Sequence, residues 1–286
     1  MIRLLVVGDL NLDVRAEEPM PTACGQETRS VVRAVPGGSA GTFARVATGL
    51  GADVTFLGAV GNDAVGDVLV QDLSSHGIHP CLRRVDGPSG VVLALHRGGD
   101  RSMICSRGAN DALDEEDVDP GLFEDLHCVH VSGYAFLSVP QARAVARAIA
   151  FARDIGAAIS VTAPPANLIE SFGVELFRQA VRDAGILVLN HSEGRLLTGR
   201  TEAAAIVDAL AASHAAGALT LGSDGALAWR NEERSQARSS AILDVDPTGA
   251  GDAYAAGFVV SLQNGETLSV ANRIACETAR KHLAVR

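Results

Sequence analysis

The sequence predicts an α/β fold with a mostly parallel central sheet and helices on both of its faces. From His127 onward, short apolar strands alternate with helices, and this alternation is typical of strands that pair in parallel. Residues 2–7 form a continuous apolar run, the pattern of a strand that is buried on both faces. Residues 29–35, 90–96 and 101–105 instead alternate apolar and polar side chains, so we expect them in a small β unit outside the main sheet.

The composition favours a single large domain over residues 1–286. Of the 286 residues 47% are apolar, enough for a sizeable core, and only 4% are aromatic. The net charge of −10 argues against nucleic acid or an anionic membrane surface as a partner. The five cysteines form no Cys-x-x-Cys pair, which is typical of reduced thiols. The chain shows no signal peptide and no apolar run that could span a bilayer, so we expect a soluble cytoplasmic protein.

The first strand leads into polar residues that are candidates for ligand binding. Asn11 and Asp13 follow the buried strand and alternate with leucines, so their side chains point the same way. Open α/β sheets bind ligands at the carboxyl ends of their strands, although Asp and Asn also simply end strands. Gly37 and Gly38 then open a helix of small residues that ends at Gly51.

The middle of the chain predicts a capped helix, a β-hairpin and further strand–helix units. Residues 53–61 form a strand, and Asp63 lies at the expected N-cap of the helix that follows. A turn at residues 97–100 joins the two alternating runs 90–96 and 101–105 into a hairpin. The pattern then predicts strands at 128–132, 158–161, 186–190 and 218–221, and helices at 138–155 (ended by Gly156), 172–183, 201–215 (ended by Gly217) and 268–283.

Two of these strand ends carry polar residues that suit a nucleotide and its metal. Asn190 ends one strand and Glu193 lies in the first turn of the next helix, so both can face one metal–phosphate site. The same pair also fits a helix cap, with Glu193 near the positive end of the helix. The loop at residues 220–225 follows another buried strand, and its Gly-x-x-Gly spacing equally fits a hairpin turn.

The stretch Asp-Pro-Thr-Gly-Ala-Gly-Asp at residues 246–252 gives the most specific chemical signal. It turns from a strand through two glycines into an Ala-rich helix that we expect to begin near Asp252. The unpaired N–H groups of such a turn, together with the helix dipole, form a site for a phosphate. A carboxylate at that site can orient and deprotonate a hydroxyl that attacks the phosphate. The alternative is a structural turn in which Asp252 only caps the helix.

The lysine count excludes another way of handling phosphate. Lys281 is the only lysine of the chain, and no Gly-x-x-x-x-Gly-Lys sequence occurs. A P-loop mechanism needs that lysine on the phosphates. Phosphate chemistry in this protein would therefore depend on backbone N–H groups, arginine and a metal ion.

These motifs, in this order, resemble those of the ribokinase-like (PfkB) family of sugar and nucleoside kinases over nearly the whole chain. The motifs that carry the resemblance are residues 37–38, 108–110, 190–193 and 246–252. The resemblance implies a ribokinase-like three-layer sandwich with a small β lid formed by about residues 15–35 and 89–105. The lid is often the dimer interface in the family, so a homodimer is expected.

The resemblance also implies roles for individual residues. Asp252 would be the catalytic base, and Gly249, Ala250 and Gly251 would form the anion hole. Asn11, Asp13, Gly37, Gly38 and Asn110 would bind the acceptor, Asn190, Thr220, Gly222, Ser223 and Gly225 the nucleotide, and Glu193 a magnesium ion through water. ATP and Mg²⁺ are therefore expected. The family usually has asparagine where this chain has Thr42, and its K⁺ site near Asp246 uses residues beyond the final helix, so K⁺ stays an open expectation.

We therefore expect an ATP-dependent kinase that phosphorylates a hydroxyl of a sugar, sugar acid or nucleoside. A phosphorylated acceptor needs cationic partners, and only Arg107 and Arg33 could reach one, so the expected acceptor is unphosphorylated. Two alternatives remain. One is a kinase of a vitamin-like heterocycle from the same superfamily, which usually lacks the lid. The other is a non-catalytic sugar sensor that uses the same pocket.

Overall fold

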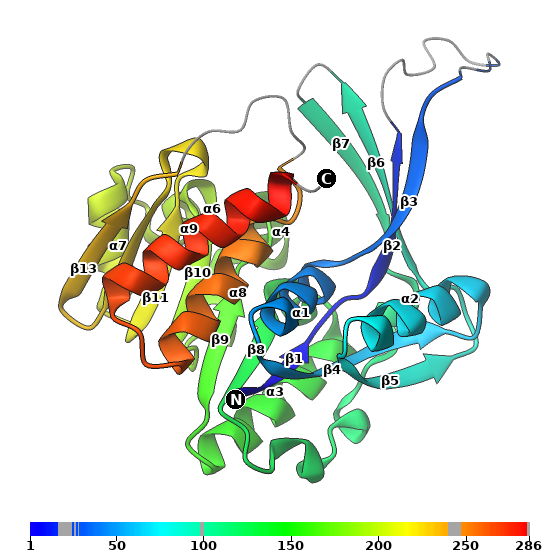
Figure 1. The fold of residues 1–286 in the computed structure, drawn as a ribbon, viewed down its shortest axis with the longest axis horizontal. Coiled ribbons are helices and arrows are strands. Elements are labelled where there is room, and N and C mark those ends of the chain that lie inside the picture. The colour runs from blue at the N-terminus through cyan, green and yellow to red at the C-terminus, as the bar shows by residue number, and fades with distance from the viewer. Residues whose placement is uncertain (17–24, 26, 28, 98–99, 240–246, 285–286) are drawn as a thin grey trace.

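A large sheet organises the molecule and brings the polar strand ends to one edge (Figure 1). The computed structural model describes residues 1–16, 25, 27, 29–97, 100–239 and 247–284. The sheet has nine strands, in the order β13 (Glu233–Ala237), β12 (Ala226–Arg230), β11 (Ala216–Thr220), β10 (Ile186–Asn190), β9 (Ala158–Thr162), β8 (Cys128–Ser132), β1 (Arg3–Val7), β4 (Asp53–Gly61) and β5 (His79–Val85). β13, β12 and β11 pair antiparallel, and all other neighbours pair in parallel.

Helices cover both faces of this sheet because its strands send alternate side chains into two cores. Leu4 and Val6 of β1 enter one core, and Leu5 and Val7 enter the other. The first core is covered by α1 (Ser39–Gly49), α2 (Ala64–Ser75), α8 (Ala250–Gln263) and α9 (Leu268–Ala284). The second is covered by α3 (Val139–Asp154), α4 (Ala166–Phe172), α5 (Val174–Ala180), α6 (His191–Thr198) and α7 (Ala203–Ala211). The architecture is therefore the predicted three-layer α/β sandwich.

A second sheet of four strands projects from the body of the molecule (Figure 1). Its order is β3 (Val32–Gly37), β2 (Asn11–Ala16), β6 (Gly90–Arg97) and β7 (Asp100–Ser106). β6 and β7 pair antiparallel, which confirms the predicted hairpin. The sequence places the start of this β unit near residue 15, whereas β2 begins at Asn11. Asn11 and Asp13 therefore belong to the small sheet.

Asp63 acts as predicted, one predicted helix is shorter than expected, and the prediction for Gly217 is wrong. Asp63 caps α2, and its carboxylate accepts a hydrogen bond from Gly66 N at 2.7 Å. The helix predicted over residues 172–183 is α5, which begins only at Val174, because Gly173 adopts a φ of 110° and separates it from α4. Gly217 does not end a helix but lies inside β11, where the ring of Trp229 packs against its backbone.

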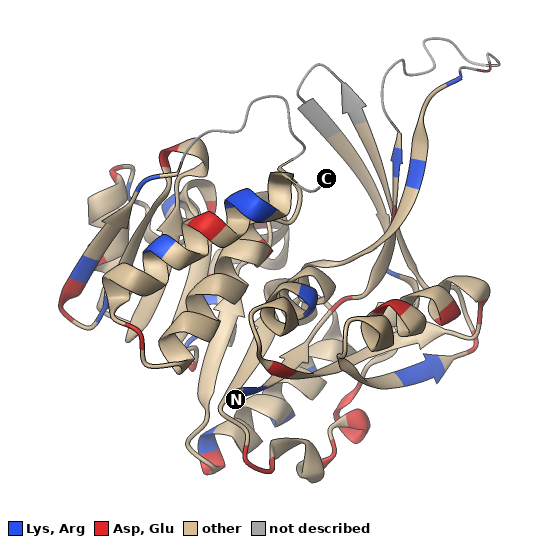
Figure 2. Cartoon of the chain, viewed as in Figure 1, with Lys and Arg blue, Asp and Glu red and all other residues tan. Residues whose placement is uncertain are grey.

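Charged side chains are spread over the helices and over both sheets (Figure 2). Short 3-10 helices connect several elements: η1 (Gly108–Ala112), η2 (Glu115–Asp117), η3 (Pro120–Phe123), η4 (Gly133–Phe136) and η5 (Gly222–Asp224). Within the described ranges, none of the helices combines the length and the apolar character that crossing a membrane requires. The strand end expected before Asp246 and the K⁺ site expected beside it lie outside the described residues.

Candidate active site

The start of α8 has the geometry of an anion site. α8 begins at Ala250, two residues before the predicted Asp252, and its N-cap Gly249 has a φ of 79°. Ala253 N donates to Gly249 O at 2.9 Å, which is the first i→i−4 bond of the helix. The N–H groups ahead of this bond have no acceptor within the helix itself. A Cβ built at Gly251 would meet no atom within 4 Å, so there is open space beside this end of α8.

The start of α1 lies against the start of α8, so two helix N-termini meet at Asp252. Ser39, the first residue of α1, donates a hydrogen bond from Oγ to Asp252 Oδ1 at 2.6 Å. Further along, α1 and α8 pack together through one apolar core (Figure 1). Each helix N-terminus carries partial positive charge, so their meeting point favours an anion.

The predicted acceptor residues come together where β2 pairs with β3. Asn11 lies opposite Gly37, and Asn11 and Asp13 are each only 7% exposed. A Cβ built at Gly37 would overlap the Asp13 carboxylate, so only glycine fits at this position. Gly38 follows directly and leads into Ser39. The acceptor residues are thus continuous with the start of α1 and with Asp252.

Asn110 supports this group from within the protein. It is completely buried, and its Oδ1 accepts from Leu10 N at 2.9 Å. Its Nδ2 donates to Asn11 Oδ1 at 2.8 Å and to Arg107 O at 2.9 Å. Because these bonds engage both ends of its amide, Asn110 can influence an acceptor by fixing the orientation of Asn11.

A charged network beside the acceptor residues is a feature that sequence reasoning missed. Arg107 Nη1 donates to Asp9 Oδ2 at 2.7 Å, and its Nε donates to Asp111 Oδ1 at 2.6 Å. Gln141 of α3, which is fully buried, accepts from Arg107 Nη2 at 2.7 Å and donates to Asp9 Oδ1 at 3.0 Å. Burial acts to lower the pKa of Arg107, but Asp9 and Asp111 together raise it. The guanidinium is therefore charged and already paired inside the protein.

Asn190 and Glu193 form a complete capping box at the start of α6. Asn190 N donates to Glu193 Oε2 at 2.7 Å, and Asn190 Nδ2 donates to Glu193 Oε1 at 2.6 Å. Glu193 N donates in return to Asn190 Oδ1 at 3.0 Å. Burial raises the pKa of Glu193 to about 8, and the negative charge of Asp252 adds to the rise, while the bond from Asn190 N opposes it. The capping role is thus present, and Glu193 is close enough to Asp252 to sense its charge.

The predicted nucleotide residues lie at the ends of two neighbouring strands. Thr220 of β11 is the register partner of Asn190 in β10. The chain then turns through η5 into β12, which pairs antiparallel with β11. Gly222 and Ser223 are exposed in this turn, whereas Gly225 is buried with its backbone against β13. The hairpin turn that the spacing allowed is therefore present, and Thr220 shares an edge with Asn190.

The model of the pfkB family, described as pfkB family carbohydrate kinase, matches residues 1–284. The chain belongs to this family. The ATP-dependent ribose-1-phosphate kinase of Halopiger xanaduensis is 29% identical over 296 residues, which cover 98% of this chain and 92% of that protein. The ribokinase of Bacillus subtilis is 26% identical over 288 residues, with the same coverage of 98% and 92%. A solved candidate ribokinase II of E. coli, in complex with ATP and Mg²⁺, superimposes with a TM-score of 0.87 at 20% identity, over 100% of this chain and 94% of that one.

These findings confirm the ribokinase-like fold and the predicted class of enzyme. The protein is a pfkB-family carbohydrate kinase, a phosphotransferase of the sugar and nucleoside kinase type. Tyr134 of η4 is a further residue of this region that the sequence did not single out. Burial raises the pKa of Tyr134, and the charges of Asp252 and Asp9 raise it further, so its hydroxyl lies near both carboxylates.

The residues of this pfkB-family kinase fit a magnesium ion that is held largely through water. In the described part of the chain, no group of three or more His, Cys, Asp or Glu side chains could hold a metal ion. Both carboxylate oxygens of Glu193 accept hydrogen bonds from Asn190, which favours an indirect contact. Mg²⁺ usually keeps several waters and is bound through one or two carboxylates together with substrate phosphates.

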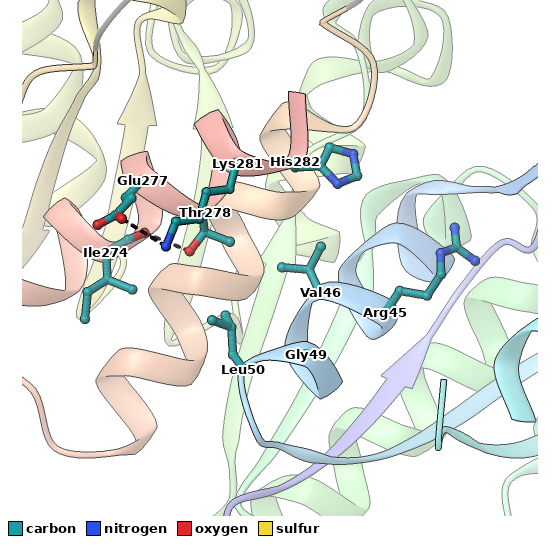
Figure 3. Close-up of a pocket in the computed structure, with 9 residues that line it drawn as sticks. All are labelled: Arg45, Val46, Gly49, Leu50, Ile274, Glu277, Thr278, Lys281 and His282. Atoms are coloured by element: carbon teal, nitrogen blue, oxygen red, sulfur yellow. Dashed lines mark hydrogen bonds and ion pairs between the residues drawn. The ribbon is translucent and has the colours of Figure 1, made fainter. Parts of the chain in front are cut away.

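A cavity of about 790 Å³ between α1 and α9 is separate from this site (Figure 3). It is lined by Arg45, Val46, Gly49, Leu50, Ile274, Glu277, Thr278, Lys281 and His282, and includes none of the predicted site residues. Arg45 is paired with Asp72 at 2.8 Å, and Lys281 is paired with Glu277 at 3.0 Å. The candidate active site is therefore at the two helix N-termini and not in this cavity.

Proposed function

We propose that this kinase transfers the γ-phosphoryl group of ATP to a hydroxyl of a small unphosphorylated carbohydrate, with Asp252 as the general base. The acceptor would be a sugar, sugar acid or nucleoside. The observation that carries the proposal is the position of Asp252. Its carboxylate lies in the first turn of α8 and is bonded to Ser39 of α1, so it stands where two helix N-termini favour a phosphate.

Phosphoryl transfer requires mainly positioning of the reactants and charge neutralisation, because its transition state is loose. The acceptor oxygen forms a bond to the γ-phosphorus while the bond to the β–γ bridging oxygen breaks and ADP leaves. The acceptor proton passes to Asp252. The N–H groups of Gly249 and Gly251 would face the charge of the transferring group, and Ala250 N, which donates to Pro247 O at 3.2 Å, would hold the turn between them. Mg²⁺, when bound, would supply further positive charge on the phosphates.

We assign the nucleotide to the strand ends beside α8. A solved structure of the same fold is a complex with ATP and Mg²⁺, which supports ATP as the nucleotide. The residues assigned to it are Asn190, Thr220, Gly222, Ser223 and Gly225. Glu193 would order water on the metal, and Asp252 already influences its pKa. Asn11, Asp13, Gly37 and Gly38 would bind the acceptor, with Asn110 holding Asn11.

An unphosphorylated acceptor is favoured because two arginines beside the acceptor residues are already paired with carboxylates; one of them is Arg15, whose Nη2 donates to Asp13 Oδ2 at 3.3 Å. Arg107 is bonded to two carboxylates, Asp9 and Asp111, so it presents no net positive charge to a substrate phosphate. One relative is named a ribose-1-phosphate kinase and another a ribokinase, so both classes of acceptor occur among similar proteins. The pairing of Arg107 favours an unphosphorylated acceptor, as the name ribokinase indicates for the second relative.

Two measurements test the proposal, both with saturating Mg·ATP and detection of ADP. First, Asp252→Asn is expected to lower kcat by about two to four orders of magnitude while ATP binding persists. Asp67→Asn is the matched control, since Asp67 is a solvent-exposed carboxylate in the first turn of α2. Turnover of Asp252→Asn within about tenfold of the wild type would refute the base assignment.

Second, kcat/KM is compared for ribose and ribose 1-phosphate. The free sugar is expected to be the better substrate. A clear preference for the phosphorylated sugar, abolished by Arg107→Ala in a correctly folded variant, would overturn the acceptor assignment. Binding of sugars without any turnover would favour the non-catalytic sensor instead.

We further propose that the small sheet is a lid over the acceptor and a dimer interface. Val92 of β6 is only 5% exposed and is not available to a partner. The exposed apolar side chains are instead on the two edge strands and beside them: Val31, Val32, Met103 and Ile104 are between 47% and 63% exposed. Exposed apolar side chains on both edges of a small projecting sheet favour a protein partner. The presence of the small sheet also weighs against a heterocycle kinase without a lid.

A further inference from the structure

Ser39 is the first residue of α1, and the backbone before it holds it in a fixed place. Gly38 is the N-cap of α1 and has a φ of 87°, a conformation that favours glycine. A Cβ built at Gly38 would overlap the carbonyl oxygen of Asp9 at the end of β1. The start of α1 is thus packed tightly against the strand end, and this packing limits the movement of the Ser39 side chain.

The hydroxyl of Ser39 is not used for the local purpose that a serine at a helix start usually serves. Such a hydroxyl commonly caps its own helix, but α1 has Gly38 as N-cap and no side-chain cap. Ser39 Oγ instead donates to Asp252 Oδ1 at 2.6 Å, across a sequence separation of 213 residues. A hydrogen bond of a neutral donor to a carboxylate is short and strong when the carboxylate is ionised.

Packing of the two helices does not need this bond. Phe43, Ala44 and Ala47 of α1 are fully buried, and they share one apolar core with Ala255 and Val259 of α8. The helices are therefore held together by apolar contacts further along their lengths. The Ser39–Asp252 bond should therefore contribute little to holding the two helices together. It acts directly on the orientation and charge of the Asp252 carboxylate.

We propose that Ser39 is a positioning residue that orients the Asp252 carboxylate and holds it in its ionised form for proton abstraction. This inference rests on the proposed role of Asp252 as general base. A hydrogen bond to one carboxylate oxygen fixes the rotation of the group and so directs its other oxygen. Catalytic bases are commonly oriented in this way by a hydrogen bond from a neighbouring side chain. The bond also favours the charged carboxylate over the protonated one.

Loss of the Ser39 hydroxyl is expected to change kcat and its pH dependence more than KM. Ser39→Ala should lower kcat by about 10- to 100-fold, because a misplaced catalytic group costs about this much. The acid limb of the pH–rate profile should move up by about one pH unit, the shift that one such hydrogen bond produces. Ser39→Thr keeps the hydroxyl and should restore most of the activity.

Other titratable groups near Asp252 must be separated from this effect. Among the described residues, Glu193 of α6 and Tyr134 of η4 have pKa values that the Asp252 charge raises. The Ser39 hydroxyl donates to Asp252 and to neither of these two side chains, so Ser39→Ala leaves them in place. If Ser39→Ala moves the acid limb in the wild-type background but not in the Asp252→Asn background, the group that titrates in this limb is Asp252.

The experiment is a double-mutant cycle of Ser39→Ala and Asp252→Asn, with kcat, KM and pH profiles measured on the full chain. If Ser39 acts through Asp252, adding Ser39→Ala to Asp252→Asn should change kcat by less than about twofold. Thr48→Ala is the matched control, since Thr48 Oγ1 bonds Ala44 O within the same helix. Its kcat should equal that of the wild type.

The outcomes distinguish the proposed positioning role of Ser39 from the proposed base role of Asp252. A Ser39→Ala variant with wild-type kcat and an unchanged acid limb overturns the inference, and so do additive losses in the cycle. If Asp252→Asn itself keeps its turnover, the proposed base is wrong, and this result is distinct from the first. Should Ser39→Ala unfold, Ser39→Thr and Ser39→Cys supply the test, because only threonine keeps an oxygen donor at the same place. Equal kcat for these two variants would then overturn the inference.

Discussion

His130 provides a prediction about acid stability that can be worked out from the structure. It lies in β8 with only 1% of its surface exposed, and its ring stacks on Phe43 of α1 with centroids 3.5 Å apart. Its ring nitrogens lie 3.2 Å from Ser160 Oγ and 3.4 Å from Thr162 Oγ1. Burial lowers the pKa of His130 to about 3, so the ring is neutral in the folded protein.

The sign of the pH effect follows from this lowered pKa. Between the unfolded pKa of 6.5 and the folded pKa of about 3, the unfolded chain binds a proton at His130 and the folded chain does not. The free energy of unfolding therefore falls as the pH falls through this window. From about pH 7.5 to about pH 5, His130 alone should remove about 2 kcal/mol of stability. The full stability contribution is present only above pH 6.5.

The test is to compare His130→Asn with the wild type by urea unfolding at both pH values. Asparagine cannot be protonated, so the variant should lose about 2 kcal/mol less than the wild type over this interval. Its stability at the higher pH should be lower, because the stacking on Phe43 is lost. His79→Asn is the control, since the side chain of His79 is 72% exposed on β5. His214, whose pKa burial also lowers, is present in all three proteins and cancels.

An equal pH dependence in the wild type and in His130→Asn would refute this reasoning. It would mean that His130 accepts a proton in the folded state, which would require water or a charge partner at the ring. Loss of pH dependence in His79→Asn instead would assign the effect to an exposed histidine. The prediction also links stability to the site, because Phe43 belongs to the helix that begins at Ser39.

Three other expectations concern the metal, the acceptor and the small sheet. Glu193→Gln should raise the Mg²⁺ concentration for half-maximal rate when the rate is measured above the Glu193 pKa of about 8, because a metal-directed charge is lost there; an unchanged titration would leave Glu193 only its role in the capping box. Asp13→Ala should lower kcat/KM for the acceptor by roughly 2–3 kcal/mol of charge-assisted hydrogen bonding, and a loss below about 1 kcal/mol would argue against contact with acceptor hydroxyls. Light scattering at micromolar concentration should show a homodimer that Ile104→Asp dissociates, and a monomeric wild type would contradict the proposed interface.

The fold could be predicted from sequence because its signals are local. Buried strands read as continuous apolar runs, and the alternation with helices fixes the parallel class without knowledge of any contact. The sequence predictions are wrong at positions where a tertiary contact or a backbone angle determines the local structure. Gly217 looks like a helix stop, but the ring of Trp229 covers it in the neighbouring strand. Gly173 divides a helical pattern only because its φ is positive there.

The same distinction applies to the candidate site. The turn at residues 249–252 could be placed because the groups that we propose for anion binding are contiguous in the chain. The link between Asp9, Arg107 and Gln141 joins residues up to 132 positions apart, and no spacing rule reveals such a partner. Ser39 and Asp252 are separated even further, so their bond appears only once α1 and α8 are packed together. Sequence motifs locate the reactive groups, and the packing of helices determines what orients them.

The charges around Asp252 determine which groups can offset the negative charge of a bound phosphate. Asp252 and Glu193 are close enough for the charge of Asp252 to raise the pKa of Glu193, and burial raises it to about 8. The only lysine, Lys281, is paired with Glu277 beside a separate cavity, and Arg107 is paired with Asp9. Of the described residues, Lys281 and Arg107 therefore do little to offset the charge of a nucleotide at this point. The two helix N-termini and a magnesium ion would supply positive charge there. A kinase built in this way should depend steeply on Mg²⁺, because the ion offsets the Asp252 carboxylate as well as the phosphates.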